Sequence, residues 1–253
     1  MASNTVLKAT DLNKSFSGIV AAKDINVTIS QGEIVGIIGA NGAGKTVFVN
    51  MITGYLKPTS GTVEFLERDI TGIEPRDATH LGLCRSFQIS QVFMTMSVKQ
   101  NLMIAMSLSK KSGKALLDPI DDEKISKECD DILELYKIKD QSENIVSTLS
   151  QGIRKLLDIA MAVVGNPKVI LLDEPTSGVS VEEKFGIMDI VIAALKQSET
   201  SVLFVEHDME IVFSVADYIT VLVSGAVLTE GEPEVIAADE RVRAVYLGEV
   251  DRG

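Results

Sequence analysis

The chain contains 253 residues, including two cysteines, and carries a formal net charge of −12 at pH 7. A chain of this length buries roughly 70–75% of the surface that its unfolded state exposes, so it needs no disulfide or structural metal. The excess of acidic residues disfavours nucleic acid and anionic lipid as partners, because both are negatively charged. Cys84 and Cys129 lie among apolar residues without metal-ligand spacing, which predicts buried, reduced thiols.

No apolar run in the sequence reaches the roughly 18–20 residues that cross a membrane. The first five residues form neither the basic segment nor the apolar core of a signal peptide. We therefore expect a chain that is neither inserted in a membrane nor secreted on its own. At a membrane, a protein partner would have to hold it.

The N-terminal part is predicted to be rich in strands. Apolar residues between glycine turns favour strands at 6–12, 25–29, 33–38 and 61–66. A short helix is expected between the last two of these, at 46–53, ending before Gly54.

Residues 39–46, Gly-Ala-Asn-Gly-Ala-Gly-Lys-Thr, join the apolar strand to this helix. The glycines let the backbone curl, so that N–H groups and the helix N-terminus face phosphate oxygens. Lys45 would reach the β- and γ-phosphates, and Thr46 would offer its hydroxyl to Mg²⁺. A chance glycine turn is the alternative, but the strand before and the helix after it favour a nucleoside-triphosphate site. The predicted nucleotide-binding residues of the loop are Gly39, Asn41, Gly42, Ala43, Gly44, Lys45 and Thr46.

The middle of the chain, from 97 to 164, has a helical pattern. Ser97 and Gln100 have the spacing of a capping box. The residues at 125, 129, 132, 133 and 136 fall on one apolar helical face. A loop is expected near 110–114, where the lysines are interpreted as solvated. This section predicts a helical sub-lobe.

After Pro167, strands and helices alternate, which predicts a parallel α/β core. Strands are expected at 169–172 and 201–206, and helices at 181–196 and 209–216. The segments 218–223 and 226–230 flank Ser224-Gly225, a hairpin signal, and a terminal helical piece is expected at 233–238.

The strand at 169–172 is followed by two acidic residues, Asp173 and Glu174. In phosphate-loop enzymes such a strand lies beside the phosphate loop, so Asp173 can hold Mg²⁺ and Glu174 can polarise the attacking water. Without the loop, a solvated acidic turn would be the better interpretation.

His207 ends another apolar strand. A lone histidine is more often a surface or core residue, but here it could reach the γ-phosphate.

Residues 149–155, Leu-Ser-Gln-Gly-Ile-Arg-Lys, predict the start of a helix with Ser150 as N-cap and Gly152 in the first turn. A serine hydroxyl and free N–H groups at such a terminus can also bind an anion. In isolation, the capping interpretation is preferred.

Taken together, these motifs resemble the ATP-binding cassette (ABC) family over essentially the whole chain. Residues 39–46 match its phosphate loop, 149–153 its signature and 169–174 its acidic strand. Gln88, in Arg-Ser-Phe-Gln, matches its Q-loop glutamine, and His207 its switch histidine. Phe16 stands where the family places an aromatic ring on adenine, although simple hairpin packing remains the alternative.

The resemblance implies an α/β fold, the phosphate-loop NTPase fold of ABC ATPases, with an antiparallel β subdomain and a helical subdomain. The whole chain, 1–253, would be a single ABC ATPase domain. Its core and β subdomain would comprise 1–92 and 165–253, and its helical subdomain 93–164.

The resemblance also implies a mechanism with ATP and Mg²⁺ as cofactors. Two cassettes would face head to tail, so that Ser150 and Gly152 bind the nucleotide of the partner cassette. ATP would hold the dimer together, and hydrolysis would release it. The catalytic residues would be Glu174, His207 and Gln88; Asp173 would join the nucleotide-binding residues; the Mg²⁺ site would use Thr46, Gln88 and Asp173.

The partners implied are integral membrane permease subunits, a second ABC ATPase subunit and, indirectly, a solute-binding protein. The chain would sit peripherally on the cytoplasmic face of the plasma membrane. The Arg-Ser-Phe-Gln and Val-Glu-His-Asp-Met segments and the closing Tyr-Leu-Gly look like importers of branched-chain amino acids or of urea and short amides. A lipopolysaccharide-type exporter stays open as an alternative. Gln88 and the apolar stretch 89–96 would receive a coupling helix of the permease, with plain packing as the alternative.

Three positions depart from the family pattern. The signature has Gln151 and Ile153 where Gly and Gln are usual, and Ser180 stands where Asp is usual. Ile153 cannot make the polar contact of glutamine, and Ser180 lacks a charge at the dimer interface. Two other classes stay open. A non-transport cassette of DNA repair or translation is disfavoured by the acidic charge, and a regulatory module that does not hydrolyse ATP is disfavoured by Glu174 and His207.

Overall fold

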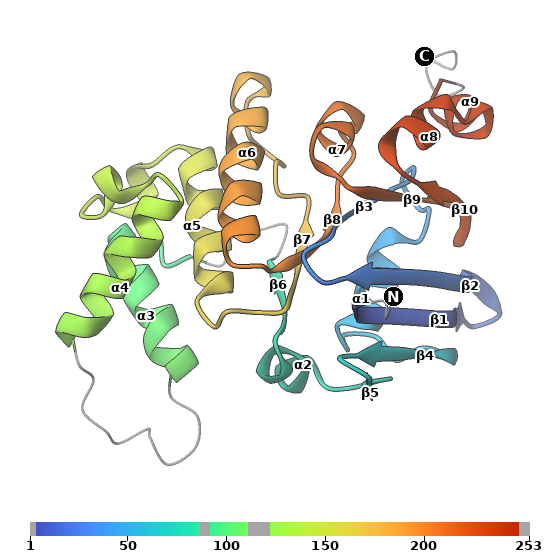
Figure 1. The fold of residues 1–253 in the computed structure, drawn as a ribbon, viewed down its shortest axis with the longest axis horizontal. Coiled ribbons are helices and arrows are strands. Elements are labelled where there is room, and N and C mark those ends of the chain that lie inside the picture. Colours follow the sequence, from blue (N-terminus) through green and yellow to red (C-terminus); the bar gives the residue numbers. More distant parts are fainter. Residues whose placement is uncertain (1–3, 87–91, 111–121, 248–253) are drawn as a thin grey trace.

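The structure is a computed structural model that describes residues 4–86, 92–110 and 122–247, and it contains two sheets (Figure 1). The four-stranded sheet has the order β2-β1-β4-β5, and the six-stranded sheet has the order β10-β9-β3-β8-β7-β6. The strands are β1 (Thr5–Phe16), β2 (Ile19–Ser30), β3 (Ile34–Ile38), β4 (Ser60–Phe65), β5 (Arg68–Asp69), β6 (Leu83–Ser86), β7 (Val169–Asp173), β8 (Ser201–Val205), β9 (Tyr218–Val223) and β10 (Ala226–Gly231). Pairing is antiparallel throughout the first sheet and parallel in the second, except for the hairpin of β9 and β10.

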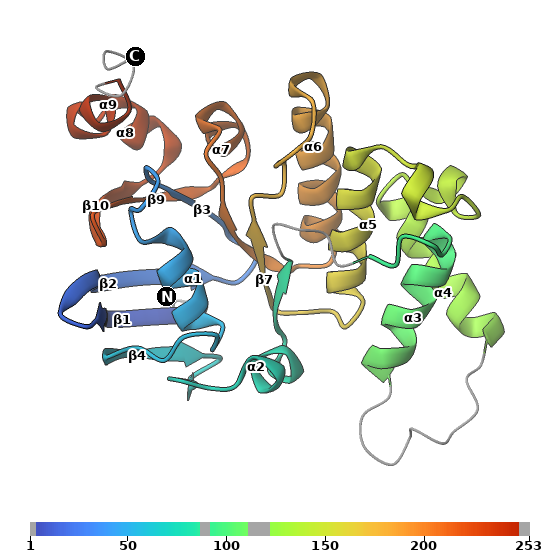
Figure 2. The ribbon, with the colours of Figure 1, turned by 180° about the vertical axis from the view of Figure 1, so that it is seen from behind.

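The helices cover the second sheet on both faces. Helix α1 lies between the two sheets (Figure 2), whereas α5, α6 and α7 lie over the opposite face, and α3 and α4 form the far end of the molecule (Figure 1). The helices are α1 (Lys45–Ile52), α2 (Pro75–Leu81), α3 (Val98–Lys110), α4 (Asp122–Leu135), α5 (Gln151–Val163), α6 (Val181–Gln197), α7 (Met209–Val215), α8 (Pro233–Ala238) and α9 (Glu240–Leu247).

Two hydrophobic cores follow from the alternation of side chains along the central strands. Residues of one parity, such as Leu171 of β7 and Leu203 of β8, pack with α1 and the four-stranded sheet. Residues of the other parity, such as Ile170 and Phe204, pack with α5, α6 and α7. Because successive side chains of a strand point to opposite faces, a sheet covered on both sides needs strands that are apolar throughout. This explains the uninterrupted apolar runs in the sequence.

The predicted parallel α/β core is confirmed, and so is the predicted hairpin of residues 218–223 and 226–230. The sheet-forming N-terminal segments are longer than predicted, since β1 and β2 have 12 residues each. Ser224 and Gly225, with φ of 49° and 83°, form the tight turn between β9 and β10, as their sequence indicated. Strand β6 and helices α2 and α9 were missed; β6 is only 4 residues long and gives too short a pattern to recognise.

The predicted helical pattern at 97–164 corresponds to α3, α4 and α5 with short 3₁₀ turns before α5. The apolar face of α4 is buried as expected, with Ile125, Cys129 and Leu133 no more than 4% exposed. Both cysteines are buried thiols, as predicted. Among the described residues, no helix combines the length and the hydrophobicity that crossing a membrane requires.

The N-terminus of α3 carries the predicted capping box. The N–H of Gln100 donates to the Ser97 hydroxyl at 3.2 Å, and the N–H of Ser97 donates to the Gln100 side-chain oxygen at 2.9 Å. These two bonds satisfy donors that a helix terminus otherwise leaves free.

We predict that Ser97→Ala lowers the free energy of unfolding by about 1 kcal/mol, because it removes the N-cap acceptor. Urea unfolding followed by circular dichroism measures the loss. The control is Ser107→Ala on the same helix, whose hydroxyl only donates to the carbonyl of Met103 one turn earlier. An equal effect of the two changes would show that the capping box contributes nothing specific.

Candidate nucleotide-binding site

The predicted site residues gather at one edge of the six-stranded sheet. Strands β3, β8 and β7 are parallel neighbours in that order, so their carboxyl ends lie side by side. The phosphate loop follows β3, His207 follows β8 with one residue between, and Asp173 ends β7. β8 therefore lies between the acidic strand and the strand of the phosphate loop. His207 follows the strand next to Asp173 and Glu174, as predicted.

The phosphate loop depends on glycines, at some positions for backbone conformation and at others for close packing. Gly44, the N-cap of α1, has φ of 100°, and Gly42 has φ of 80°, both in the left-handed region that favours glycine. A Cβ on Gly39 would lie 2.4 Å from the carbonyl oxygen of Leu222. The loop also packs on the hairpin turn, because the N–H of Gly225 donates to Ala43 O at 2.9 Å. The two glycine-dependent turns thus hold each other in place.

Lys45 begins α1 and turns back onto its own loop. Its ammonium group donates to the carbonyl oxygen of Ala40 at 3.1 Å and also to that of Gly39. Burial lowers the pKa of Lys45 from its ordinary value, while the charges of Glu174 and Asp173 act in the opposite direction. The ammonium group is thus held in the loop, close to the two acids, where phosphate oxygens would replace the carbonyl partners.

Glu174 and His207 touch each other across the strand ends. His207 Nε2 lies 2.8 Å from Glu174 Oε1. Glu174 has φ of 48°, a left-handed conformation that costs a non-glycine residue about 1–2 kcal/mol. Its N–H donates to Val205 O at 2.9 Å, so the neighbouring strand maintains this conformation. Backbone strain of this kind is concentrated at functional sites.

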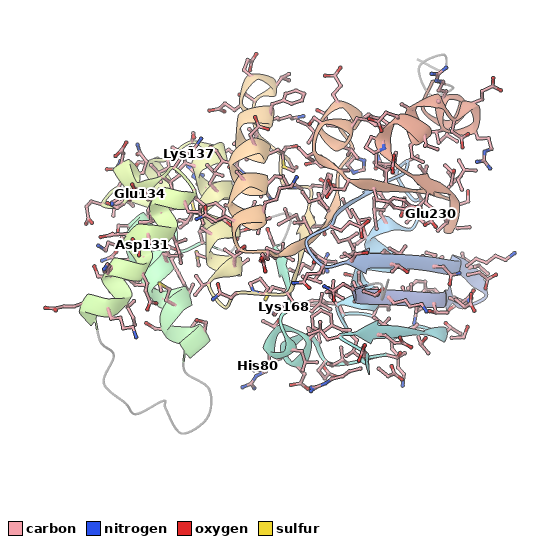
Figure 3. All side chains as sticks on the ribbon, viewed as in Figure 1. His80, Asp131, Glu134, Lys137, Lys168 and Glu230 are labelled. Atoms are coloured by element: carbon pink, nitrogen blue, oxygen red, sulfur yellow. The ribbon has the colours of Figure 1, made fainter. Side chains whose placement is uncertain are left out.

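A cavity of ≈ 550 Å³ connects these groups. Its walls include residues 41–47 of the phosphate loop and α1, together with Glu174 and His207. Ile19 and Val20 of β2 and the turn Ser224-Gly225 close the other side. His80, the other histidine of the chain, points away from α2 (Figure 3) and does not line this cavity. A cavity with a phosphate loop, a carboxylate and an imidazole has the composition of a ligand site.

Phe16 and Asp173 are not among the residues that line this cavity. Phe16 pairs with the lining residue Ile19 across the β1–β2 hairpin and is 46% exposed, with Lys14 Nζ 5.2 Å from its ring centroid. Asp173 is ion-paired with Arg85 at 2.6 Å. Gln88 lies outside the described residues. The stacking, metal-binding and Q-loop roles of these residues stay predictions.

The signature residues do not line the cavity of their own chain. Ser150 is the N-cap of α5, as predicted, and accepts the N–H of Ile153 at 3.5 Å. Gly152 is buried against α6, where an added Cβ would lie 2.6 Å from Ile187 Cδ1. Ile153 packs against the core, and Ser180 donates its hydroxyl hydrogen bond to Glu183 at 2.9 Å. The signature therefore presents the helix terminus outward, away from its own phosphate loop.

Sequence reasoning missed a group of buried charges behind the site. Lys155 of α5 is 0% exposed and Glu206 is 4% exposed. Glu206 accepts the N–H and the hydroxyl of Thr176 at 2.8 and 2.7 Å and the N–H of His207 at 3.1 Å. Burial lowers the pKa of Lys155, and the carboxylates of Asp158 and Glu206 oppose this shift. The sequence signals were the positions of the two charged residues: Glu206 stands directly before His207, and Lys155 lies two residues after the signature.

The fold and the site define a phosphate-loop nucleotide-binding domain. Residues 22–177 match the sequence model of the family described as ABC transporter, and residues 226–252 match that of the branched-chain amino acid ATP-binding cassette transporter. The chain therefore belongs to the ABC transporter family and is an ATPase with that family's fold, which confirms the resemblance and the fold expected from the sequence. Members of this family bind ATP.

Relatives cover nearly the whole chain. It is 34% identical to the probable branched-chain amino acid transport ATP-binding protein LivG of Archaeoglobus fulgidus, over 97% of this chain and 96% of that one. It is 32% identical to the high-affinity LivG protein of Escherichia coli (strain K12), over 98% and 99%. The crystal structure of the ADP conformation of MJ1267, an ATP-binding cassette of an ABC transporter, is similar with a TM-score of 0.85 and 32% identity, over 96% of this chain and 99% of that one.

We predict that Lys45→Ala abolishes measurable ATP binding and does not merely slow hydrolysis, because the ammonium group would contact phosphates in the ground state as well. Isothermal titration calorimetry with ATP tests this. Lys8→Ala, at an exposed position of β1, is the control. ATP affinity in Lys45→Ala equal to that of the control would remove Lys45 from the site.

Proposed function

We propose that the chain is the ATP-hydrolysing subunit of an importer of branched-chain amino acids or related small polar solutes. The observation that carries the hydrolytic part is the Glu174–His207 pair, 2.8 Å apart, facing the cavity of the phosphate loop. The import of such solutes is supported by the C-terminal match at 226–252 and by the printed function of the LivG relatives. These relatives support this reading and not the lipopolysaccharide exporter or a non-transport cassette.

In this proposal, the phosphates of ATP lie over residues 39–46, and Lys45 contacts the β- and γ-phosphates. Glu174 accepts a proton from the attacking water, and His207 fixes the position of Glu174 relative to the γ-phosphate. The pair is 20% and 43% exposed at Glu174 and His207, so both side chains remain accessible to water and substrate.

The residues at the strand ends fit Mg²⁺. Thr46 offers a hydroxyl and Asp173 a carboxylate, the hard oxygen ligands that this ion prefers. No cluster of three or more histidine, cysteine or acidic side chains able to hold a metal occurs within the described part of the chain. A site completed by nucleotide phosphates needs no such cluster, because the phosphates supply the remaining ligands. The bound ion would neutralise charge that develops on the phosphates.

The partner cassette would complete the site. Neither Ser150 nor Gly152 lines the cavity of its own chain, so the helix N-terminus of α5 would serve a phosphate held by a second cassette. The ATP sites would then lie at the interface of two cassettes, whose association ATP strengthens and hydrolysis weakens.

A second groove would receive the permease. A cavity of ≈ 530 Å³ lies between α2, β6, α3 and α5. Leu108, on its wall, is 70% exposed, and nearby Phe93 and Met94 are 50% and 39% exposed, whereas Val92 packs against the core. Exposed apolar side chains beside a groove favour a protein-docking surface.

The chain would form a single ABC ATPase domain, with its helical subdomain at 93–164. It would be bound peripherally to permease subunits at the cytoplasmic face, and a solute-binding protein would supply the substrate.

We predict that Glu174→Gln keeps ATP binding but loses roughly 100-fold or more of its turnover, since general-base groups contribute about 10²–10⁴. The dimer should accumulate with ATP. Steady-state hydrolysis and size-exclusion chromatography test both halves, and uptake of labelled leucine by membrane vesicles with the assembled transporter tests the function. The control is Glu64→Gln, exposed on β4. Near-normal hydrolysis by Glu174→Gln would contradict its role; active hydrolysis without uptake of leucine or related solutes would contradict the importer.

We also predict unequal ATP sites if the second cassette keeps the usual glutamine and aspartate at the positions of Ile153 and Ser180. The site with this chain's Lys45 and Glu174 would then be the faster one. Glu174→Gln should reduce transport more than the equivalent change in the partner. Transport by the reconstituted complex, with each single mutant, measures the difference. Equal losses would show that Ile153 and Ser180 have no functional effect.

A further inference from the structure

Arg85 forms an ion pair with Asp173 of the acidic strand. It lies on the edge strand β6 and pairs in register with Leu171 of β7. Leu171 packs in the core that contains α1, and Asp173, two residues later, points to the same face because side chains alternate along a strand. Arg85 and Asp173 therefore meet on the face that carries α1, the helix of the phosphate loop.

The Arg85 guanidinium group is held by three side chains. Nη2 donates to Asp173 Oδ2 at 2.6 Å, and Nη1 donates to Asn50 Oδ1 of α1 at 2.7 Å. The ring of Tyr55, just after α1, lies 5.5 Å from the guanidinium carbon. The side chains of Arg85 and Asp173 are only 9% and 15% exposed. This arrangement is tighter than a surface ion pair, which contributes little and is easily screened.

The arginine is fixed independently of Asp173, so it can orient the carboxylate. The guanidinium group is planar with donors in a fixed fork, and Asn50 and Tyr55 orient it independently of Asp173. The fork contacts Oδ2 of Asp173, whereas a carboxylate has two oxygens and about four acceptor positions. Oδ2 of Asp173 is thus held by Arg85. The carboxylate still has acceptor positions for a ligand at the strand end.

We propose that Arg85 is a positioning residue for the Mg²⁺ that accompanies the nucleotide: it holds Asp173 by Oδ2 and leaves Oδ1 for the ion or its water. This inference rests on the proposed function, in which Asp173 serves the metal. Partners that orient a metal-binding carboxylate typically change metal affinity about 10–100-fold when removed. Arg85 also lines the groove assigned to the permease, so the same side chain joins that groove to the nucleotide site.

The test separates metal binding from nucleotide binding. Mn²⁺, a paramagnetic substitute for Mg²⁺, is titrated into the full-length chain with saturating ADP and followed by electron paramagnetic resonance. ADP affinity without metal is measured in EDTA by calorimetry. For Arg85→Met, we expect Mn²⁺ affinity to fall about 10–100-fold with unchanged metal-free ADP affinity. Arg85→Lys should give a smaller loss, because it keeps the charge but not the fork. The control is Arg76→Met, exposed on α2.

The outcomes distinguish this inference from the proposed function. Wild-type Mn²⁺ affinity in Arg85→Met, or an equal loss of metal-free ADP affinity, would overturn the positioning role and leave an ion pair that only joins β6 to β7. Asp173→Asn tests the function itself: if it binds Mn²⁺ with ADP as the wild type does, the metal role of Asp173 fails. If Asp173→Asn loses the ion and Arg85→Met does not, only the inference on Arg85 fails.

A second variant covers the case in which Arg85→Met does not fold, because that change leaves a largely buried carboxylate without its cation. Asn50→Ala removes one anchor of the fork and keeps the ion pair. We expect Mn²⁺ affinity to fall severalfold, with metal-free ADP affinity and the urea midpoint close to those of Arg76→Met. Unchanged Mn²⁺ affinity in Asn50→Ala would contradict the orienting role of the fork.

Discussion

The parallel pairing of β3, β8 and β7 is the constraint on which the site depends. Parallel strands in register end at the same edge of a sheet, so three segments far apart in the sequence deliver their last residues to one place. This strand pairing brings together the phosphate loop, His207 and the acidic pair 173–174. Because both faces of these strands are buried in hydrophobic cores, a slip in register would disrupt the close packing of side chains on both faces. The precision of the site thus derives from the packing of the sheet.

Buried charges lie directly behind these strand ends, and they form two groups. Arg85 joins β6, β7 and α1 through Asp173 and Asn50. Glu206 joins β8 to the loop after β7 through Thr176, close to the buried Lys155 of α5. Burying charges is costly unless each is paired and hydrogen-bonded, and replacing one partner leaves the other uncompensated. These groups therefore bind the strand ends to the helices in one defined geometry.

The signature segment is fixed by packing within its own chain, whereas the proposed function assigns it to the nucleotide of a second cassette. The N-terminus of α5 is fixed by the close approach of Gly152 to Ile187 on α6, which excludes a larger residue there. The same packing directs Ser150 away from the cavity of its own chain. Ile153 contributes an apolar contact to the core in place of a polar group. The structural role of this segment is thus satisfied within the chain, and in the proposed dimer the same helix N-terminus would serve the partner's nucleotide.

The sequence by itself determined the local structure and the chemistry. The glycines of 39–46, the apolar runs that end in acids or histidine and the Ser97–Gln100 cap have short-range physical causes, and the order of the motifs identified the family. Tertiary structure decided what depends on contacts across the chain: β8 between β3 and β7, the 2.8 Å approach of Glu174 to His207, the pairing of Arg85 with Asp173, and the short edge strand β6. No local pattern contains these contacts, because strand order and side-chain pairing arise only when separate segments pack together.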